Sequence, residues 1–239
     1  MTSEETTEEF LISLCPLCLR VRFLSGLCGE EVMIALIDYG AGNLTSVRKA
    51  LAALGAEVRV PRATEDLADV SGVIVPGVGN FKATAAMTTD WREAIVGVVG
   101  NGRPLLGICL GLQWLFQGSA EAPDCSGLGL MTGQCDRLPS VMTDSSGASH
   151  PLKIPHVGWN TLHFPRRTAL FEGVAEGSQV YFTHSYAAPV TQDAAAVTSY
   201  GVSFASAVER GQVFGVQFHP EKSGDVGLQV LRNFLALAR

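Results

Sequence analysis

A cysteine between two glycines is the residue of this sequence best suited to covalent chemistry. In Gly107-Ile108-Cys109-Leu110-Gly111, the cysteine follows a short apolar run, residues 105–108, and precedes a run with helical spacing, residues 110–116. This is the form of a nucleophile elbow with cysteine in place of serine, because the glycines let a buried strand turn sharply and expose the side chain between them. The dipole and free amides of the following helix favour the nucleophilic thiolate. The other interpretation is a buried structural cysteine ahead of a helix.

The triplet His219-Pro220-Glu221 supplies the two further groups that a nucleophilic thiol needs. Alternate residues of an extended segment point the same way, and Pro220 is expected to keep this segment extended, so that the imidazole and the carboxylate are presented together. The imidazole would act as general base, and the carboxylate would orient it and stabilise the imidazolium. Such triplets also form surface turns. Together with the elbow, this one predicts a triad of Cys109, His219 and Glu221.

A thiol that transfers an acyl group also needs donors for the developing oxyanion. The turn Pro76-Gly77-Val78-Gly79 ends a neighbouring strand, and its backbone amides at Val78 and Gly79 are candidates for this role. The amide of Leu110, just after the nucleophile, is the third candidate. The alternative for the turn is an ordinary loop between a strand and a helix.

The elements that must position these residues alternate along the first half of the chain. Strands are predicted at residues 33–37, 57–60, 73–75 and 105–108, helices at 44–54 and 110–116, and an amphipathic stretch at 64–70. The second half contains loops at 120–127 and 139–151, β-type runs at 179–183, 196–200 and 213–218, and a closing helix at 225–238. We therefore expect an α/β fold with a largely parallel, doubly wound open sheet, helices on both of its faces, and some antiparallel strands in the second half.

Residues 1–32 differ from the rest, because an acidic start leads into an apolar, cysteine-rich stretch without clear periodicity. Acidic residues stand where a secretory signal would be basic. Cys15, Cys18 and Cys28 offer three thiols without a fourth ligand, which disfavours a zinc knuckle. We expect residues 1–32 to be an N-terminal extension, disordered or added by an upstream start, and residues 33–239 to form one domain.

Composition excludes several classes of function. The net charge is −6 without a basic cluster, which argues against nucleic acid as a partner. No run of 18 uncharged apolar residues occurs, so no membrane span is expected. Six cysteines are too few for a disulfide framework in a chain of 239 residues, which favours the reducing cytoplasm.

The sequence predicts neither a cofactor nor a metal. Gly40-Ala41-Gly42 follows a strand, but the third glycine of a dinucleotide fingerprint would fall at Thr45. His150, His156 and His163 lack metal-binding partners at a useful spacing.

These residues resemble a known family, the class I (triad-type) glutamine amidotransferases. More narrowly, the chain is similar to the glutaminase subunits of imidazole glycerol phosphate synthase from residue 33 to about residue 239. The segments that carry this resemblance are residues 38–43 (DYGAGN), 76–81 (PGVGNF), 107–113 (GICLGLQ), 153–160 (KIPHVGWN), 181–186 (YFTHSY) and 215–223 (GVQFHPEKS).

The resemblance implies that glutamine is hydrolysed through a thioester at Cys109. The ammonia would pass to a cyclase partner, a (β/α)₈ barrel bound in a heterodimer, which forms imidazole glycerol phosphate and an aminoimidazole carboxamide ribonucleotide in histidine biosynthesis. By position, the residues that hold glutamine are Gln113, Thr183, His184, Ser185 and Tyr186, and those at the partner interface are Asn43, Trp159 and Asn160.

Without the resemblance, three of these residues have simpler interpretations. Gln113 would be a polar residue on a helix face, His184 a packed histidine, and Trp159 a plug in the core. The sequence also departs from the family, since Ala187 and Ala188 stand where another aromatic residue is usual.

Three other functions remain open at this point. They are the glutaminase subunit of another assembly, such as anthranilate synthase or pyridoxal phosphate synthase, a non-catalytic regulatory subunit, and a free-standing hydrolase of γ-glutamyl compounds. The segment at residues 153–160 argues against the first, and the complete triad argues against the second. A rearrangement of residues 77–79 that forms the oxyanion hole when the partner binds is a further hypothesis from the resemblance.

Overall fold

The computed structural model describes residues 32–144 and 146–239. The predictions for the N-terminal extension and for Cys15, Cys18 and Cys28 fall outside these residues. Within the described part, seven strands form the main sheet in the order β12-β13-β14-β4-β3-β1-β2. Their bounds are β1 (Met33–Leu36), β2 (Glu57–Arg59), β3 (Gly72–Val75), β4 (Leu105–Ile108), β12 (Ala194–Tyr200), β13 (Val202–Arg210) and β14 (Val213–Val216).

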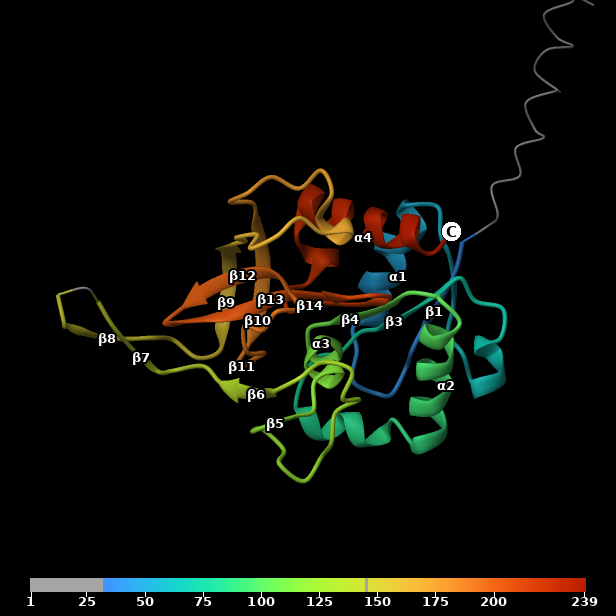
Figure 1. Cartoon of the computed structure of the whole chain (residues 1–239), viewed down its shortest axis with the longest axis horizontal. Helices are drawn as coiled ribbons and strands as arrows, with labels where there is room; N and C mark the ends of the chain where they lie inside the picture. Colours follow the sequence, from blue (N-terminus) through green and yellow to red (C-terminus); the bar gives the residue numbers. More distant parts are fainter. Residues whose placement is uncertain (1–31, 145) are drawn as a thin grey trace, which may run out of the picture. The chain divides into compact units, whose positions relative to one another are not determined.

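The main sheet is parallel from β14 to β2, and antiparallel only where β12 and β13 join it. Its helices are α1 (Leu44–Ala53), α2 (Thr89–Gly100), α3 (Leu110–Leu115) and α4 (Gly224–Leu237). Figure 1 shows α1 and α4 on one face of the sheet and α2 and α3 on the other. The predicted α/β fold, with a largely parallel, doubly wound sheet, is confirmed.

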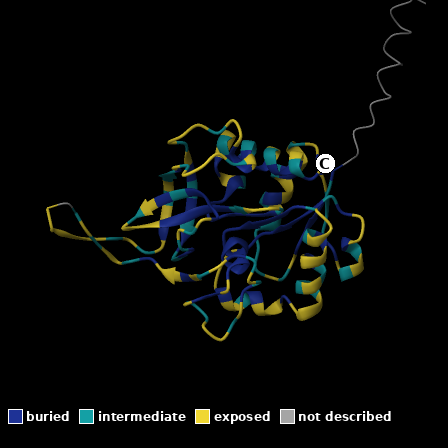
Figure 2. Ribbon diagram, in the orientation of Figure 1, coloured by how far each residue is buried: buried dark blue, intermediate teal, exposed yellow. Residues whose placement is uncertain are grey.

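Both faces of the sheet are buried because alternate residues of each strand pack on opposite sides. Ile34 and Leu36 of β1 pack in the cluster that includes α1 and α4, whereas Ala35 packs in the cluster that includes α2. All four residues of β3, β4 and β14 are buried, as the dark blue centre of Figure 2 shows. Such strands read as continuous apolar runs, which is why they could be identified from the sequence.

Smaller sheets lie beside the main one. The first pairs β9 (His156–Thr161) with β10 (Gln179–His184), antiparallel, and sets His156 opposite His184. The second contains β5 (Gly118–Ser119), β6 (Gln134–Arg137) and β11 (Tyr186–Ala187). The short 3-10 helices are η1 (Thr64–Leu67), η2 (Phe81–Ala86), η3 (Ala169–Phe171) and η4 (Pro220–Lys222).

Two expectations about local structure need correction here, and one helix was not expected. The predicted loop at residues 139–151 contains a hairpin, β7 (Val141–Thr143) with β8 (Ser149–Pro151), whose strands pair only with each other and stay largely exposed (Figures 1 and 2). No apolar alternation therefore marks it. The amphipathic stretch at 64–70 is only the 3-10 turn η1. Helix α2 was missed, although its buried Ile95 and Val98 have helical spacing.

Candidate active site

The sharp turn at the end of β4 is set by backbone geometry that only glycine neighbours allow. Cys109 has φ +54° and ψ −103°, and it is the only non-glycine residue with positive φ in the described chain. A Cβ atom on Gly111 would lie 1.9 Å from the Val75 carbonyl oxygen, and one on Gly107 would lie 2.5 Å from the Gly111 carbonyl oxygen. The strain at Cys109 is therefore held in place by close packing on both sides, as at other functional elbows.

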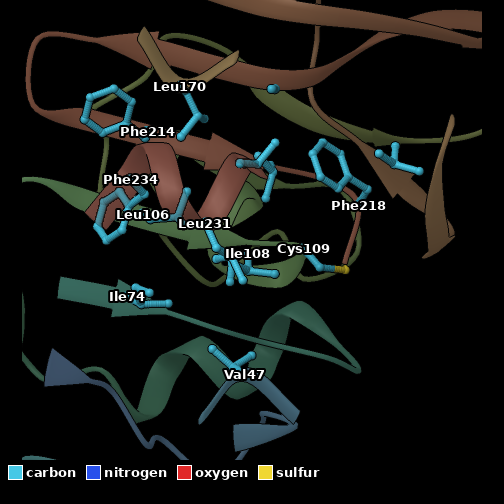
Figure 3. Packing of buried hydrophobic residues seen from close by; sticks show 14 of the residues in the cluster. Val47, Ile74, Leu106, Ile108, Cys109, Leu170, Phe214, Phe218, Leu231 and Phe234 are labelled. Atoms are coloured by element: carbon cyan, nitrogen blue, oxygen red, sulfur yellow. The ribbon is translucent and has the colours of Figure 1, made fainter. Parts of the chain in front are cut away.

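The Cys109 sulfur lies at the edge of the packed side chains, beyond Ile108, in Figure 3. Two polar groups contact it. The thiol donates to the Thr183 carbonyl at 3.8 Å, and the Gln217 carboxamide Nε2 donates to the sulfur at 3.6 Å. The first contact suits the thiol and the second suits the thiolate.

His219 and Glu221 form a buried pair, with 2.9 Å between Nδ1 and Oε1. The expected extended conformation is wrong: Pro220 and Glu221 lie in the 3-10 turn η4, which starts directly after His219. Pro220 suits the first position of this turn because its fixed φ is helical and its missing N–H is not needed there. The carboxylate thus folds back onto the imidazole instead of lying beside it on a strand.

The protonation state of His219 follows from its neighbours. Burial lowers the pKa of His219, but the Cys109 sulfur and the Glu221 carboxylate outweigh burial and raise it to about 9. The Nε2 atom is buried and has no aligned hydrogen-bond partner among the described residues. A pKa of about 9 favours the protonated imidazole at neutral pH.

The predicted oxyanion donors are not assembled in this conformation. The Val78 amide donates to the Ala41 carbonyl at 2.8 Å, and the Leu110 amide donates to the Gly77 carbonyl at 3.3 Å. Gly79, with φ +98°, lines the cavity at the sulfur. Glycine is favoured at residue 77, since a Cβ there would lie 2.7 Å from the Leu110 Cβ, which is fixed to the backbone of α3, and would also overlap the Tyr39 hydroxyl. A change in the backbone of residues 77–79 would be required to free these amides.

A cavity of about 190 Å³ opens at Cys109, smaller than a typical drug-sized ligand pocket. The structure places all five predicted glutamine-holding residues on its wall. It is lined by Gly79, Cys109, Leu110, Gln113, Glu121, Pro155, Thr183, His184, Ser185 and Tyr186. Sequence reasoning missed Glu121 and Pro155: no motif marked Glu121, and Pro155 lies in the segment of residues 153–160 without a predicted role. Glu121 is the only acidic residue of this wall, and its Oε2 accepts from the Phe81 amide at 2.7 Å.

The side chains of Gln113 and His184 line the cavity and also form hydrogen bonds within the protein. The Gln113 Nε2 donates to the Tyr186 carbonyl at 2.9 Å and to the Gln217 Oε1 at 3.2 Å. His184 uses both ring nitrogens, with Nδ1 at 2.9 Å from the Tyr186 carbonyl and Nε2 at 2.9 Å from His156 Nδ1. The packed-histidine interpretation of His184 thus describes its side chain well.

The residues predicted at the partner interface lie in different surroundings. Trp159 is 54% exposed, with its ring edge to face on Tyr181, so the interpretation as a core plug is wrong. Asn160 is half-buried and holds His156 Nε2 at 3.3 Å. The Asn43 side chain caps α1 by accepting from the Ser46 amide at 3.3 Å.

The paired histidines predict a loss of stability in acid. Burial lowers the pKa of His156 to about 4 and is the main cause that lowers the pKa of His184 to about 3. Between about pH 6.5 and pH 4 the unfolded chain binds more protons, so the free energy of unfolding should fall by about 1.4 kcal/mol per pH unit for each histidine. Urea unfolding over this range should show a slope smaller by about 1.4 kcal/mol per pH unit in His156→Gln. An unchanged slope in that variant, equal to that of the exposed control His150→Gln, would contradict this.

No cluster of three metal-binding side chains occurs among the described residues. Within residues 32–144 and 146–239, no helix is long and apolar enough to cross a membrane.

Comparison with known proteins agrees with this geometry. The family model "Glutamine amidotransferase class-I" matches residues 35–238. The chain is 45% identical over 212 residues to the imidazole glycerol phosphate synthase subunit HisH of Moorella thermoacetica, covering 86% of this chain and 95% of that protein. It is 46% identical over 210 residues to the subunit of the same name from Geobacillus kaustophilus, covering 86% and 97%.

Among solved structures, PurLQS from Thermotoga maritima has a similar fold, with a TM-score of 0.64 at 19% identity over 87% of this chain and 100% of that one. The chain therefore belongs to the class-I glutamine amidotransferase family and, within it, to the HisH subunits of imidazole glycerol phosphate synthase.

Proposed function

We propose that residues 33–239 hydrolyse glutamine to glutamate and ammonia and deliver the ammonia to a cyclase subunit, which makes imidazole glycerol phosphate and an aminoimidazole carboxamide ribonucleotide in histidine biosynthesis. The observation that carries this proposal is a cysteine on a strained elbow beside a buried His219–Glu221 pair, at a cavity of amino-acid size. The identity of about 45% to HisH subunits supports the cyclase subunit as the recipient of the ammonia, over the recipients that other amidotransferases supply.

The reaction follows the charge state of the site. The Cys109 thiolate attacks the side-chain amide carbon of glutamine, and the carbonyl oxygen becomes an oxyanion. The C–N bond then breaks while His219 gives its proton to the nitrogen, which leaves as ammonia, and a γ-glutamyl thioester remains. Neutral His219 next takes a proton from water, whose oxygen attacks the thioester. Glutamate leaves, and the sulfur and His219 return to the states in which they began the cycle.

The cavity wall offers groups that match the rest of the substrate. Glu121 would bind the α-ammonium group, because it is the only acidic residue on that wall. Gln113 and the segment of residues 183–186 would hold the remaining polar groups of glutamine.

The partner would be a (β/α)₈-barrel cyclase subunit bound in a heterodimer. Trp159 is a suitable anchor for this interface, since exposed aromatic side chains frequently dominate binding energy. Asn43 and Asn160 would lie at the same interface. We place the complex in the cytoplasm, because a thiol nucleophile must stay reduced, and the cysteines of the described chain, Cys109, Cys125 and Cys135, are free.

Partner binding should control the reaction through the oxyanion donors. The Val78 and Leu110 amides are engaged in this conformation, and one missing donor commonly costs about 10²–10³-fold in rate. We therefore expect glutamate release to rise at least about 100-fold when the cyclase subunit and its nucleotide substrate are added. The measurement compares the chain alone, with the cyclase subunit, and with the cyclase subunit plus nucleotide.

The alternative functions give other results in this assay. Equal turnover in all three mixtures would indicate a free-standing hydrolase. No turnover in any mixture would indicate a non-catalytic subunit.

A further inference from the structure

A continuous series of hydrogen bonds runs from β9 toward the nucleophile, and its first member is Asn160. The Asn160 Oδ1 accepts from the Thr161 amide at 2.8 Å, and its Nδ2 donates to the Ser199 carbonyl at 3.1 Å. These two backbone contacts identify the oxygen and the nitrogen of the Asn160 carboxamide. The group that faces His156 Nε2 at 3.3 Å is therefore Nδ2, which donates to it.

The direction of the series continues through the two histidines. Because His156 Nε2 accepts, its proton lies on Nδ1 and is donated to His184 Nε2 at 2.9 Å. His184 then carries its proton on Nδ1 and donates it to the Tyr186 carbonyl at 2.9 Å, which can only accept. Asn160 at one end and the Tyr186 carbonyl at the other thus require the same tautomers, with the proton on Nδ1 in both His156 and His184. Protonation of either ring would set two donors against each other, which agrees with the lowered pKa of both histidines.

The Tyr186 carbonyl joins this series to the catalytic sulfur. The same oxygen accepts from the Gln113 Nε2, and this nitrogen also donates to the Gln217 Oε1. The Gln217 carboxamide therefore turns its Nε2 to the Cys109 sulfur. Gln217 is 0% exposed, so water cannot replace either contact. If the Gln217 carboxamide turned over, its Oε1 would face the Cys109 sulfur and its NH₂ group would face the NH₂ group of Gln113.

We propose that Gln217 is a catalytic residue of this site, whose carboxamide N–H binds the Cys109 sulfur and stabilises the thiolate. Gln113 is a positioning residue, because its Nε2 donates to the Gln217 Oε1 and keeps this carboxamide from turning over. The proposal rests on the proposed function of Cys109 as the nucleophile. It adds a donor that neither the triad nor the oxyanion hole includes, and it gives the buried Gln113 a role toward the sulfur as well as toward glutamine.

The rate at which iodoacetamide alkylates Cys109, followed by peptide mass spectrometry over a range of pH, tests this directly. Hydrogen bonds to charged groups are strong enough that Gln217→Met should slow alkylation at neutral pH about tenfold and move the whole profile to higher pH. Gln113→Met should move it in the same direction, because a freed Gln217 carboxamide turns over. Thr198→Val is the matched control, since Thr198 is fully buried and donates one hydrogen bond, to the Thr161 carbonyl, outside the series.

Each outcome decides the proposal. A shifted profile in both glutamine variants, with the wild-type profile in Thr198→Val, supports it. A wild-type profile in folded Gln217→Met overturns it, as does an equal shift in Thr198→Val. Should Gln217→Met fail to fold, folded Gln113→Met decides in the same way. Alkylation needs neither glutamine nor the partner, so this result is separate from the success or failure of the proposed glutaminase.

Discussion

Cys109→Ala is expected to lower glutamine hydrolysis by the partner-bound chain by at least about 10⁴-fold, the scale seen when a covalent nucleophile is removed. The reason is that no thioester can form without the sulfur, and water in this site is a much weaker nucleophile than the thiol. His219→Gln should cost a similar factor, because the members of such a unit are not additive and the leaving nitrogen loses its proton donor. Glutamate release in the presence of the cyclase subunit and its nucleotide measures both.

The control for this prediction is Cys125→Ala. Cys125 is a half-buried free thiol in the loop that follows β5 and is absent from the cavity wall, so this variant should keep the wild-type rate. If Cys109→Ala kept a tenth of the wild-type rate, covalent catalysis at this residue would be excluded.

Gly111→Ala is expected to destabilise the fold by about 3 kcal/mol or more, because an added Cβ would overlap the Val75 carbonyl oxygen at 1.9 Å. Neither the backbone of β3 nor the start of α3 can move without disturbing the centre of the sheet. The measurement is urea unfolding, with Gly97→Ala as the control. A Cβ at Gly97, on the exposed side of α2, meets nothing within 4 Å, and alanine there should stabilise the helix by about 0.5–1 kcal/mol. Equal stability of the two variants would show that the elbow does not depend on this contact.

The central sheet and the elbow could be predicted because their signals are local. Strand β4 lies at residues 105–108 as expected, since a strand buried on both faces reads as a continuous apolar run. The glycines around Cys109 mark the turn by themselves. The closing helix was predicted to within one residue at each end, because its buried Val230, Leu231 and Phe234 follow helical spacing.

Other parts of the site depend on contacts between residues far apart in the chain. Nothing near Glu121 indicates that it lines the cavity. Gln217 lies two residues before His219 in the segment of residues 215–223, but its contact with a sulfur 108 positions away was not predicted. The conformation of Glu221 was mistaken because a proline fits both an extended segment and the first position of a helical turn. The Val78 and Leu110 amides donate to the Ala41 and Gly77 carbonyls, and nothing in the sequence of the glycine turn indicates these two contacts.

The central claim is that Cys109 attacks the side-chain carbonyl of glutamine. The most direct test is to treat the partner-bound chain with a glutamine analogue that carries a diazoketone in place of the carboxamide, and to locate the adduct by peptide mass spectrometry. We predict one adduct, on Cys109, which excess glutamine prevents and which forms as glutamate release is lost. Loss of glutamate release with the adduct on another residue, or with Cys109 unmodified, would contradict the claim.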